Sequence, residues 1–285
     1  MPRAVFLGPE GTHTGEAARA CPALADWELI PVTGIRPTFE KFAQGEADAA
    51  VLPLENSLEG SVGTTLDVLA GDHGAFAKIR AELVRPIAHA LLTRRRVPDD
   101  EPGFKKWVLG IVSHPQALAQ CAESLAKRFP HSVVEPAAST ADAARQIAGG
   151  RAGWVCLAPR EAAKQYNLVI RDEDLSDEPG NRTRFVVLAR EDAAPTGRDR
   201  TSIVFGLDRD HPGGLHGAIG EFAMRGINLS RIESRPKKTT AGEYWFFVDL
   251  EAHRTESAAA EAIAALEKKA AFFRLLGSYA RVDWG

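Results

Sequence analysis

Four polar segments within residues 1–190 place chemically useful side chains beside expected turns. The first, residues 8–18 (GPEGTHTGEAA), lies between an expected strand and an expected helix. Gly8 and Gly11 allow close approach of the backbone to a ligand, and the free N–H groups at a helix start attract anions. Thr12 and Thr14 add hydroxyl groups. The spacing is neither that of a Walker loop nor that of a dinucleotide motif, and a tight turn with a helix cap explains it equally well.

The second segment, residues 53–69 (PLENSLEGSVGTTLDVL), begins where a buried strand is expected to end. Glu55, Asn56 and Ser57 would lie at the carboxyl end of that strand, the edge at which open α/β sheets bind ligands. Thr65 belongs to the short helix expected next. Taken alone, caps and turns account for these residues as well as a binding site does.

The third segment, residues 113–121 (SHPQALAQC), follows another expected strand. Ser113 or His114 can cap the helix that begins here, and Gln120 lies on a helix face that can point into a cleft. A thiol nucleophile formed by His114 and Cys121 is disfavoured, because the two residues would be two helical turns apart. Cys121 instead suits a packed core.

The fourth segment, residues 181–190 (NRTRFVVLAR), places a hydroxyl, a guanidinium and an aromatic ring at the start of an expected strand. Side chains alternate along a strand, so Thr183 and Phe185 would share one face and Arg184 would take the other. An edge strand made of ordinary β-forming residues is the alternative interpretation.

The elements that must position these side chains alternate between short apolar runs and amphipathic segments. This order predicts an α/β fold with mostly parallel sheets. We expect two lobes separated by a cleft, lobe one at about residues 1–76 plus 178–190 and lobe two at about 77–177. Residues 191–200 (EDAAPTGRDR) are polar and aperiodic, as expected of a linker. Residues 201–285 follow the order βαββαβ, the ferredoxin-like arrangement.

Composition excludes several classes of protein. The chain has 285 residues, 45% hydrophobic and 26% charged, with a formal net charge of -3. This balance argues against nucleic acid or an anionic membrane as a partner. No apolar run reaches the roughly 18 residues of a membrane span, and no signal peptide precedes the first strand, so we expect a cytoplasmic protein. Cys21, Cys121 and Cys156 are odd in number and widely spaced, which predicts reduced core cysteines.

Together, and in this order, the four segments resemble the prephenate dehydratase family. The motifs are GPxGT near the start, P-x-E-N-S followed by T-L-D, SHPQAL-x-QC and N-x-TRF, and the match runs from Val5 to about Val248. The last part of the chain resembles an ACT domain, with GGLHGAIGEF, GINLSRIESRP and EYWFFVDLEAH. The resemblance implies a two-lobed catalytic domain, similar to periplasmic binding proteins, followed by a ferredoxin-like ACT regulatory domain.

Members of the family convert prephenate to phenylpyruvate in phenylalanine biosynthesis, by loss of carbon dioxide and water, without a cofactor or metal. The resemblance makes Thr183 the key catalytic residue, whose hydroxyl assists departure of the ring hydroxyl. It also implies catalytic roles for Glu55, Asn56 and Gln120, and substrate contacts for Ser57, Thr65, Ser113, Arg184 and Phe185, which Thr12 and Thr14 are expected to join. Arogenate as substrate, and a binding protein without catalysis, remain alternatives. One departure is His13, where members usually have Tyr or Phe.

The resemblance further implies that the ACT domain binds phenylalanine between paired domains of two subunits, in a homodimer or homotetramer. The effector site would consist of Gly213, Gly214, Leu215, Glu233, Ser234, Arg235 and Pro236. The alternative is a dimerisation module that no longer binds an effector.

Overall fold

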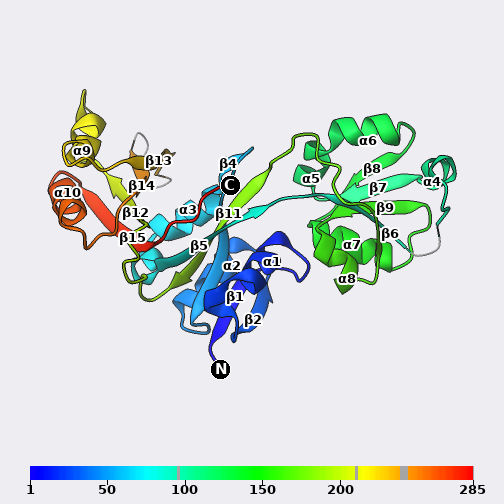
Figure 1. Cartoon of the computed structure of the whole chain (residues 1–285), viewed down its shortest axis with the longest axis horizontal. Coiled ribbons are helices and arrows are strands. Elements are labelled where there is room, and N and C mark those ends of the chain that lie inside the picture. Colours follow the sequence, from blue (N-terminus) through cyan, green and yellow to red (C-terminus); the bar gives the residue numbers. More distant parts are fainter. Residues whose placement is uncertain (95–96, 209–210, 238–242, 285) are drawn as a thin grey trace.

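The computed structural model describes residues 1–94, 97–208, 211–237 and 243–284, which form three sheets arranged along the long axis of the molecule (Figure 1). The first lobe lies in the middle, between the second lobe and the C-terminal domain. Within the described residues, no helix is long and apolar enough to cross a membrane. The three cysteines are free and buried, as predicted.

The first sheet has the order β2-β1-β3-β11-β5, with the short β4 paired to β3. Its strands are β1 (Arg3–Leu7), β2 (Glu28–Val32), β3 (Ala49–Asn56), β4 (Gly60–Ser61), β5 (Lys78–Pro86) and β11 (Arg182–Ala189). Strands β2, β1 and β3 are parallel, whereas β11 runs antiparallel to both β3 and β5. The helical elements of this lobe are α1 (His13–Ala20), η1 (Pro22–Leu24), α2 (Ile35–Ala43), α3 (Gly63–Ala70) and η2 (Asp72–Phe76).

The chain crosses to the second lobe later than the sequence suggested. The Gly-containing and acidic stretch near residue 72 forms the short η2 turn, and the chain then continues into β5, which pairs with β11 in the first sheet. The crossing therefore follows Pro86 rather than residue 77. Turn-forming residues marked the end of a helix here, and not a change of lobe.

The second sheet has the order β10-β6-β9-β7-β8. Its strands are β6 (Ala90–Thr93), β7 (Gly110–Ser113), β8 (Val133–Pro136), β9 (Trp154–Ala158) and β10 (Val169–Asp172). Strands β8, β7 and β9 are parallel, and β6 and β10 complete the sheet in antiparallel pairs. The helices are α4 (Glu101–Trp107), α5 (Pro115–Gln120), α6 (Ala122–Arg128), α7 (Thr140–Ala148) and α8 (Arg160–Gln165).

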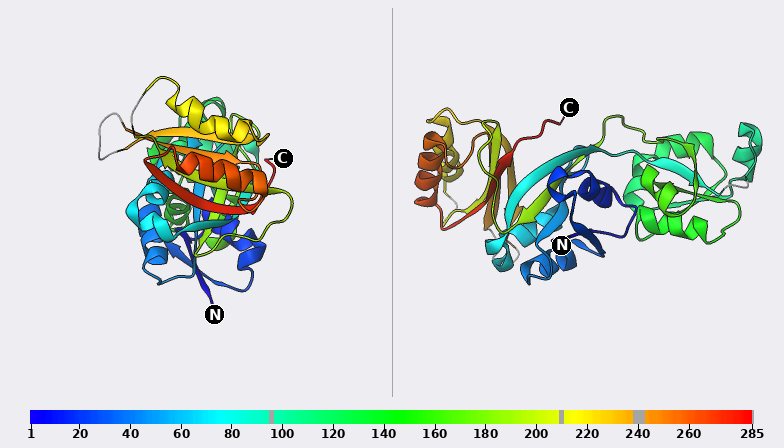
Figure 2. Two further views of the ribbon diagram at one scale, coloured as in Figure 1. Left: turned by 90° about the vertical axis from the view of Figure 1, so that its left-hand side faces the viewer. Right: turned by 60° about the horizontal axis from the view of Figure 1, so that its bottom comes forward.

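The C-terminal domain has the predicted βαββαβ order. It consists of β12 (Asp199–Gly206), α9 (Gly214–Ala223), β13 (Leu229–Pro236), β14 (Tyr244–Leu250), α10 (Ser257–Glu267) and β15 (Phe272–Ala280), with the antiparallel sheet order β13-β14-β12-β15. Both helices cover the sheet face that points away from the first lobe (Figure 2).

The opposite face of this sheet packs directly on the first lobe. One hydrophobic cluster contains Leu52 and Ile79 of the first lobe together with Phe247 and Leu276 of the C-terminal domain. At Gly277 the backbones meet so closely that a Cβ atom would lie 2.3 Å from the carbonyl oxygen of Ile79. Only glycine fits such an approach. The two domains therefore share one core.

Candidate active site

A cavity of about 660 Å³ lies between the two lobes. Its walls come from the carboxyl end of the first sheet, including Asn56 on β3 and Thr183 on β11, and from second-lobe residues such as Gln120 and Ser139. Both lobes thus contribute polar side chains to one cavity, the usual location of a small-molecule site.

Thr183 and Asn56 are direct cross-strand neighbours. They occupy paired positions on the antiparallel strands β11 and β3, and both side chains are buried and line the cavity. The register between the two strands shifts one pair further on, between Arg184 and Phe185. Such irregularities are common beside active sites because they change the direction of a side chain.

Hydrogen bonds fix the orientation of the Asn56 amide. Its Oδ1 accepts from the backbone N–H groups of Leu58 at 3.0 Å and Glu59 at 3.1 Å. Its NH₂ group therefore points the other way and donates to Asn181 Oδ1 at 2.7 Å and to Thr183 Oγ1 at 3.0 Å. Because Thr183 Oγ1 accepts this bond, the hydroxyl proton of Thr183 is left to donate to a ligand in the cavity.

The same chain of amides continues to Gln120 and His89. Asn181 Nδ2 donates to Gln120 Oε1 at 3.0 Å, and Gln120 Nε2 donates to Glu59 Oε1 at 2.8 Å. Gln120 Oε1 can only accept, so His89 Nε2, 2.7 Å away, must carry a proton. Burial lowers the pKa of His89, which favours the neutral ring. Its Nδ1 atom is then a bare acceptor, buried and without a hydrogen bond to any described residue.

The starts of three helices contribute positive potential at the cavity. Thr12 caps α1 by accepting from the N–H of Gly15, and Ser139 caps α7 by accepting from that of Asp142. The start of α2, at Gly34, also lines the wall. No lysine or arginine lines it among the residues that the structure describes. An anionic ligand would therefore be met by helix dipoles and neutral donors.

Two imidazole rings lie side by side at this wall. The rings of His13 and His89 are in an edge-to-face arrangement with centroids 6.1 Å apart, and both residues line the cavity. His13 Nδ1 is 3.7 Å from Glu16 Oε2, and neither ring nitrogen forms a hydrogen bond to a described residue. Each of the two rings thus has a nitrogen left for a ligand in the cavity.

Six of the expected site residues come together in the cavity: Thr12, Thr14, Asn56, Gln120, Thr183 and Phe185. Thr183 and Phe185 share one face of β11, as the alternation along the strand predicted. Sequence reasoning gave no role to Asn181, His89 or Ser139. Asn181 is the first residue of the N-x-TRF motif, which was the available signal; His89 and Ser139 carried none.

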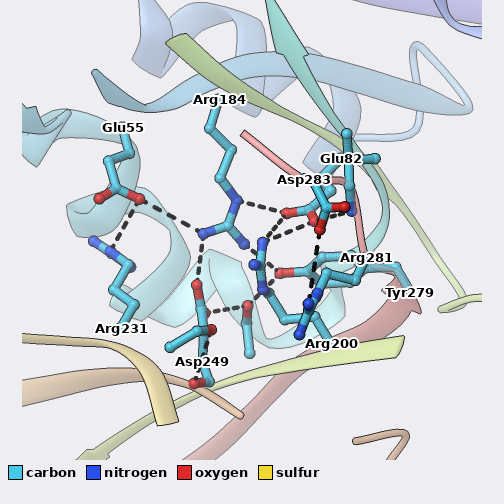
Figure 3. A network of polar contacts seen from close by, with 12 residues as sticks. Glu55, Glu82, Arg184, Arg200, Arg231, Asp249, Tyr279, Arg281 and Asp283 are labelled. Carbon is cyan, nitrogen blue, oxygen red and sulfur yellow. Dashed lines mark hydrogen bonds and ion pairs between the residues drawn. The ribbon is translucent and has the colours of Figure 1, made fainter. Parts of the chain in front are cut away.

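Arg184 and Glu55 do not line the cavity, contrary to expectation. Both lie next to a cavity residue in the chain, and strand alternation directs them to the opposite face of the sheet. There Arg184 Nη1 is 3.7 Å from Glu55 Oε2, within a polar network at the C-terminal domain (Figure 3). The motifs therefore predicted substrate contacts for two charged side chains that instead contact each other and the C-terminal domain.

Three hydroxyl groups that were expected to contact the substrate form hydrogen bonds within the protein instead. Thr65 Oγ1 donates to the carbonyl of Pro53 at 2.6 Å, and Ser113 Oγ donates to that of Leu157 at 2.7 Å. Both residues are fully buried outside the cavity wall. Ser57 is exposed, and its Oγ accepts from the N–H of Arg182. These hydroxyls hold loops and helices in place.

The expected effector residues lie on two elements of the C-terminal domain. Gly213 has φ +82° and is followed by α9, which begins at Gly214 and Leu215. Glu233, Ser234, Arg235 and Pro236 lie on the edge strand β13, where exposed and half-buried residues alternate. Ser234 and Pro236 are exposed, whereas Arg235 Nε donates to Asp67 of α3 in the first lobe.

The fold and the cavity define the class of the protein: a two-lobed α/β domain with a polar interlobe site for a small molecule, attached to a small βαββαβ domain. Residues 4–193 match the family described as prephenate dehydratase, and residues 201–268 match the ACT domain. The chain belongs to the prephenate dehydratase family, whose activity is that of a carbon–oxygen lyase.

Individual relatives agree over nearly the whole chain. A prephenate dehydratase of Amycolatopsis methanolica is 39% identical over 99% of this chain and 90% of its own length. The crystal structure of prephenate dehydratase from Arthrobacter aurescens in complex with L-Phe is 39% identical, with a TM-score of 0.88 and coverage of 99% and 91%. GqqA, described as a novel type of quorum-quenching acylase, is 26% identical, with a TM-score of 0.84 and coverage of 99% and 98%.

Proposed function

We propose that the interlobe cavity converts prephenate to phenylpyruvate, with Thr183 as the donor to the departing hydroxyl. The observation that carries this assignment is the Asn56 amide, which occupies the acceptor side of Thr183 Oγ1 and leaves its proton for the substrate. In the reaction the bond from the ring to its carboxylate breaks and releases carbon dioxide. The electron pair moves through the ring, which becomes aromatic, and the bond to the ring hydroxyl breaks.

The departing oxygen needs one proton to leave as water. A threonine hydroxyl is a weak acid, far from the ideal for full proton transfer near neutral pH. We therefore assign it the stabilisation of the leaving oxygen by a strong hydrogen bond, reinforced because Asn56 donates to the same oxygen atom. The proton of the final water then comes from solvent as the product leaves. Asn56 and Gln120 act by holding the amide chain in one direction.

The two substrate carboxylates require positive potential, which the starts of α1, α2 and α7 provide at the cavity. Thr12 and Thr14 add hydroxyl donors, and Phe185 offers an apolar surface for the ring. His13 lines the same cavity, and its imidazole can hydrogen-bond to a carboxylate, so we assign it a contact to one of the two carboxylates.

The test is prephenate turnover by the wild type, Thr183→Val and Thr183→Ser. Valine keeps the shape and removes the hydroxyl, so we expect kcat to fall by about 10²–10³. Serine keeps the hydroxyl and should retain most of the activity. A Thr183→Val variant as active as the wild type would remove Thr183 from the mechanism, and a wild type that forms no phenylpyruvate would overturn the assignment.

The same assay decides between the alternatives. Arogenate has an amino group where prephenate has a keto group, so parallel assays of the two substrates give the preference directly. Acyl transfer, as in the acylase relative, would need an activated nucleophile. None of the three cysteines lines the cavity, and burial raises the pKa of Cys121 to about 12, so a thiolate is not available there. Turnover of an acyl amide without prephenate turnover would favour that second activity.

We also propose that the ACT domain binds phenylalanine, which a solved relative at 39% identity holds. The backbone N–H groups at the start of α9 would bind its carboxylate, next to the left-handed Gly213. Calorimetric titration with phenylalanine should show binding by the wild type and its loss in Gly213→Val. Gly45→Val is the matched control, because Gly45 has φ +81° in the first lobe. Binding that survives Gly213→Val would move the effector site elsewhere.

The enzyme is proposed to act in the cytoplasm as a homodimer or homotetramer. Strand β13 is an edge of the C-terminal sheet, and its Ile232 is 49% exposed, which supports pairing of two ACT domains there. Light scattering should give the mass of a dimer or a tetramer at micromolar concentration, and Ile232→Lys should lower it. A wild type with the mass of one chain would contradict this arrangement.

A further inference from the structure

Arg184 is a completely buried guanidinium one residue away from Thr183. It is 1% exposed, is not among the residues that line the cavity, and points into the polar network drawn in Figure 3. Burying a cation costs free energy unless hydrogen bonds and opposite charges surround it. The partners of Arg184 therefore decide where this part of β11 can lie.

Those partners come from both domains. Arg184 Nε donates to Glu82 Oε2 of β5 at 2.6 Å, within the first lobe. Arg184 Nη1 donates to Asp249 Oδ2 of β14 at 2.6 Å, and Nη2 donates to Tyr279 Oη of β15 at 2.7 Å, both in the ACT domain. A single side chain thus connects the strand that carries Thr183 to two strands of the ACT sheet.

The acceptors of Arg184 are themselves fixed. Glu82 accepts from Arg200 Nη1 at 2.7 and 2.6 Å and from the backbone N–H of Val282 at 2.7 Å. Asp249 Oδ1 accepts from Ser202 Oγ, which also contacts Tyr279 Oη. Despite its burial, the pKa of Asp249 is lowered, chiefly by the charges of Arg184 and Arg231. The network is therefore charged and fully hydrogen-bonded at both carboxylates.

The network also reaches the strand that carries the expected effector residues. Asp249 pairs in register with Arg231 on β13, five residues before Pro236. Arg231 Nε lies 3.5 Å from Glu55 Oε2, and Glu55 is the neighbour of Asn56 on β3. Both members of the Thr183–Asn56 pair consequently have a chain neighbour bound to the ACT sheet.

We propose that Arg184 is a positioning residue through which the ACT domain controls the Thr183 hydroxyl. Thr183 and Arg184 are paired with β3 and β5, and the register with β3 shifts only after Arg184. The backbone ladder thus ties Thr183 to the first lobe, and the guanidinium of Arg184 adds a link from this end of β11 to the ACT sheet. An effector that shifts β13 and β14 would move Asp249, and with it Arg184 and the hydroxyl one residue away. This inference rests on the proposed function of the cavity and of the ACT site.

The test uses Tyr279→Phe and Asp249→Asn in the full-length enzyme, with prephenate turnover and phenylalanine binding measured separately. Both changes lie in the ACT domain, away from the cavity. We expect the effect of saturating phenylalanine on turnover to shrink by about tenfold or more, whereas phenylalanine still binds. Arg184→Lys keeps the charge but cannot reach three acceptors at once, so kcat should fall by about 10- to 100-fold at a nearly unchanged KM.

The matched control is Arg274→Met. Arg274 Nη1 also bridges the domains, because it donates to the carbonyl oxygens of Leu69 and Gly71, yet it contacts no member of the Arg184 network in Figure 3. This variant should lose stability and keep the response to phenylalanine. A full response in both Tyr279→Phe and Asp249→Asn would overturn the proposal and leave the network as a structural support.

Failure of the underlying assignments gives different results. A wild type that turns over prephenate but does not respond to bound phenylalanine would overturn the coupling while leaving the cavity's function intact. A wild type without prephenate turnover would overturn the function of the cavity itself. An Arg184→Lys variant with wild-type kcat would show that Arg184 does not position Thr183.

Discussion

The two faces of strand β11 use opposite kinds of polar chemistry. On the cavity face, Thr183 belongs to a chain of neutral amides and a neutral imidazole, in which each donor has a defined direction. On the other face, Arg184 lies among carboxylates and contacts two domains. The neutral groups orient the hydroxyl proton of Thr183, whereas the ion pairs of Arg184 hold the first lobe and the ACT domain together. One strand therefore serves catalysis and domain coupling through alternate residues.

The largest expected effect is a loss of stability when the charge of Arg184 is removed from the face of β11 that points to the ACT domain. Arg184→Met leaves Glu82 and Asp249 buried with fewer partners, which should lower the free energy of unfolding by about 3–5 kcal/mol in urea titrations. Arg198→Met, which breaks an exposed pair with Asp283, should cost less than about 1 kcal/mol. Equal losses in the two variants would show that the buried Arg184 network stabilises the fold no more than an exposed ion pair does.

A smaller effect is expected on the cavity face, in rate rather than in stability. Asn56→Ala removes the donor that occupies Thr183 Oγ1, so kcat should fall by about 100-fold while KM changes little. The control is Ser57→Ala, one residue further along and exposed, which should stay within about threefold of the wild type. If Asn56→Ala retained the wild-type kcat, the hydrogen bond from Asn56 to Thr183 would not contribute to catalysis.

The third prediction concerns pH. The folded-state pKa of His89 lies below that of an unfolded histidine, because burial disfavours the charged ring. The unfolded chain therefore binds a proton first, and stability falls as pH drops from about 6.5 towards the lower folded value, by about 1.4 kcal/mol for each unit of difference. His89→Gln should flatten this dependence in urea titrations at several pH values. The exposed His131, changed to Gln, should not.

The smallest effect is expected at His13. An imidazole nitrogen can hydrogen-bond to a carboxylate and a phenyl ring cannot, so His13→Phe should raise KM for prephenate by about 3- to 10-fold. Glu16 and His89 are the ionisable groups that face His13, and neither is altered by this change. An identical KM in the two proteins would show that His13 only fills space at the cavity wall.

Periodicity and short motifs predicted the α/β class, the βαββαβ order and the shared face of Thr183 and Phe185. They failed where contacts distant in sequence decide. The role of Arg184 depends on Asp249 and Tyr279, and that of Ser113 depends on the carbonyl of Leu157. His89 could not be found because its partner Gln120 is 31 residues away in the sequence. A motif identifies a polar side chain, but the pairing of its strand in the sheet determines whether that side chain points into the cavity or away from it.

The close contact at Gly277 limits how regulation can be removed from this enzyme. Leu276 and Phe247 share a hydrophobic cluster with Leu52, so deleting the ACT domain would uncover apolar surface on the first lobe. A truncated catalytic domain should then aggregate instead of working free of its effector. Engineering of a feedback-resistant enzyme is better directed at single residues such as Tyr279, with the whole chain retained.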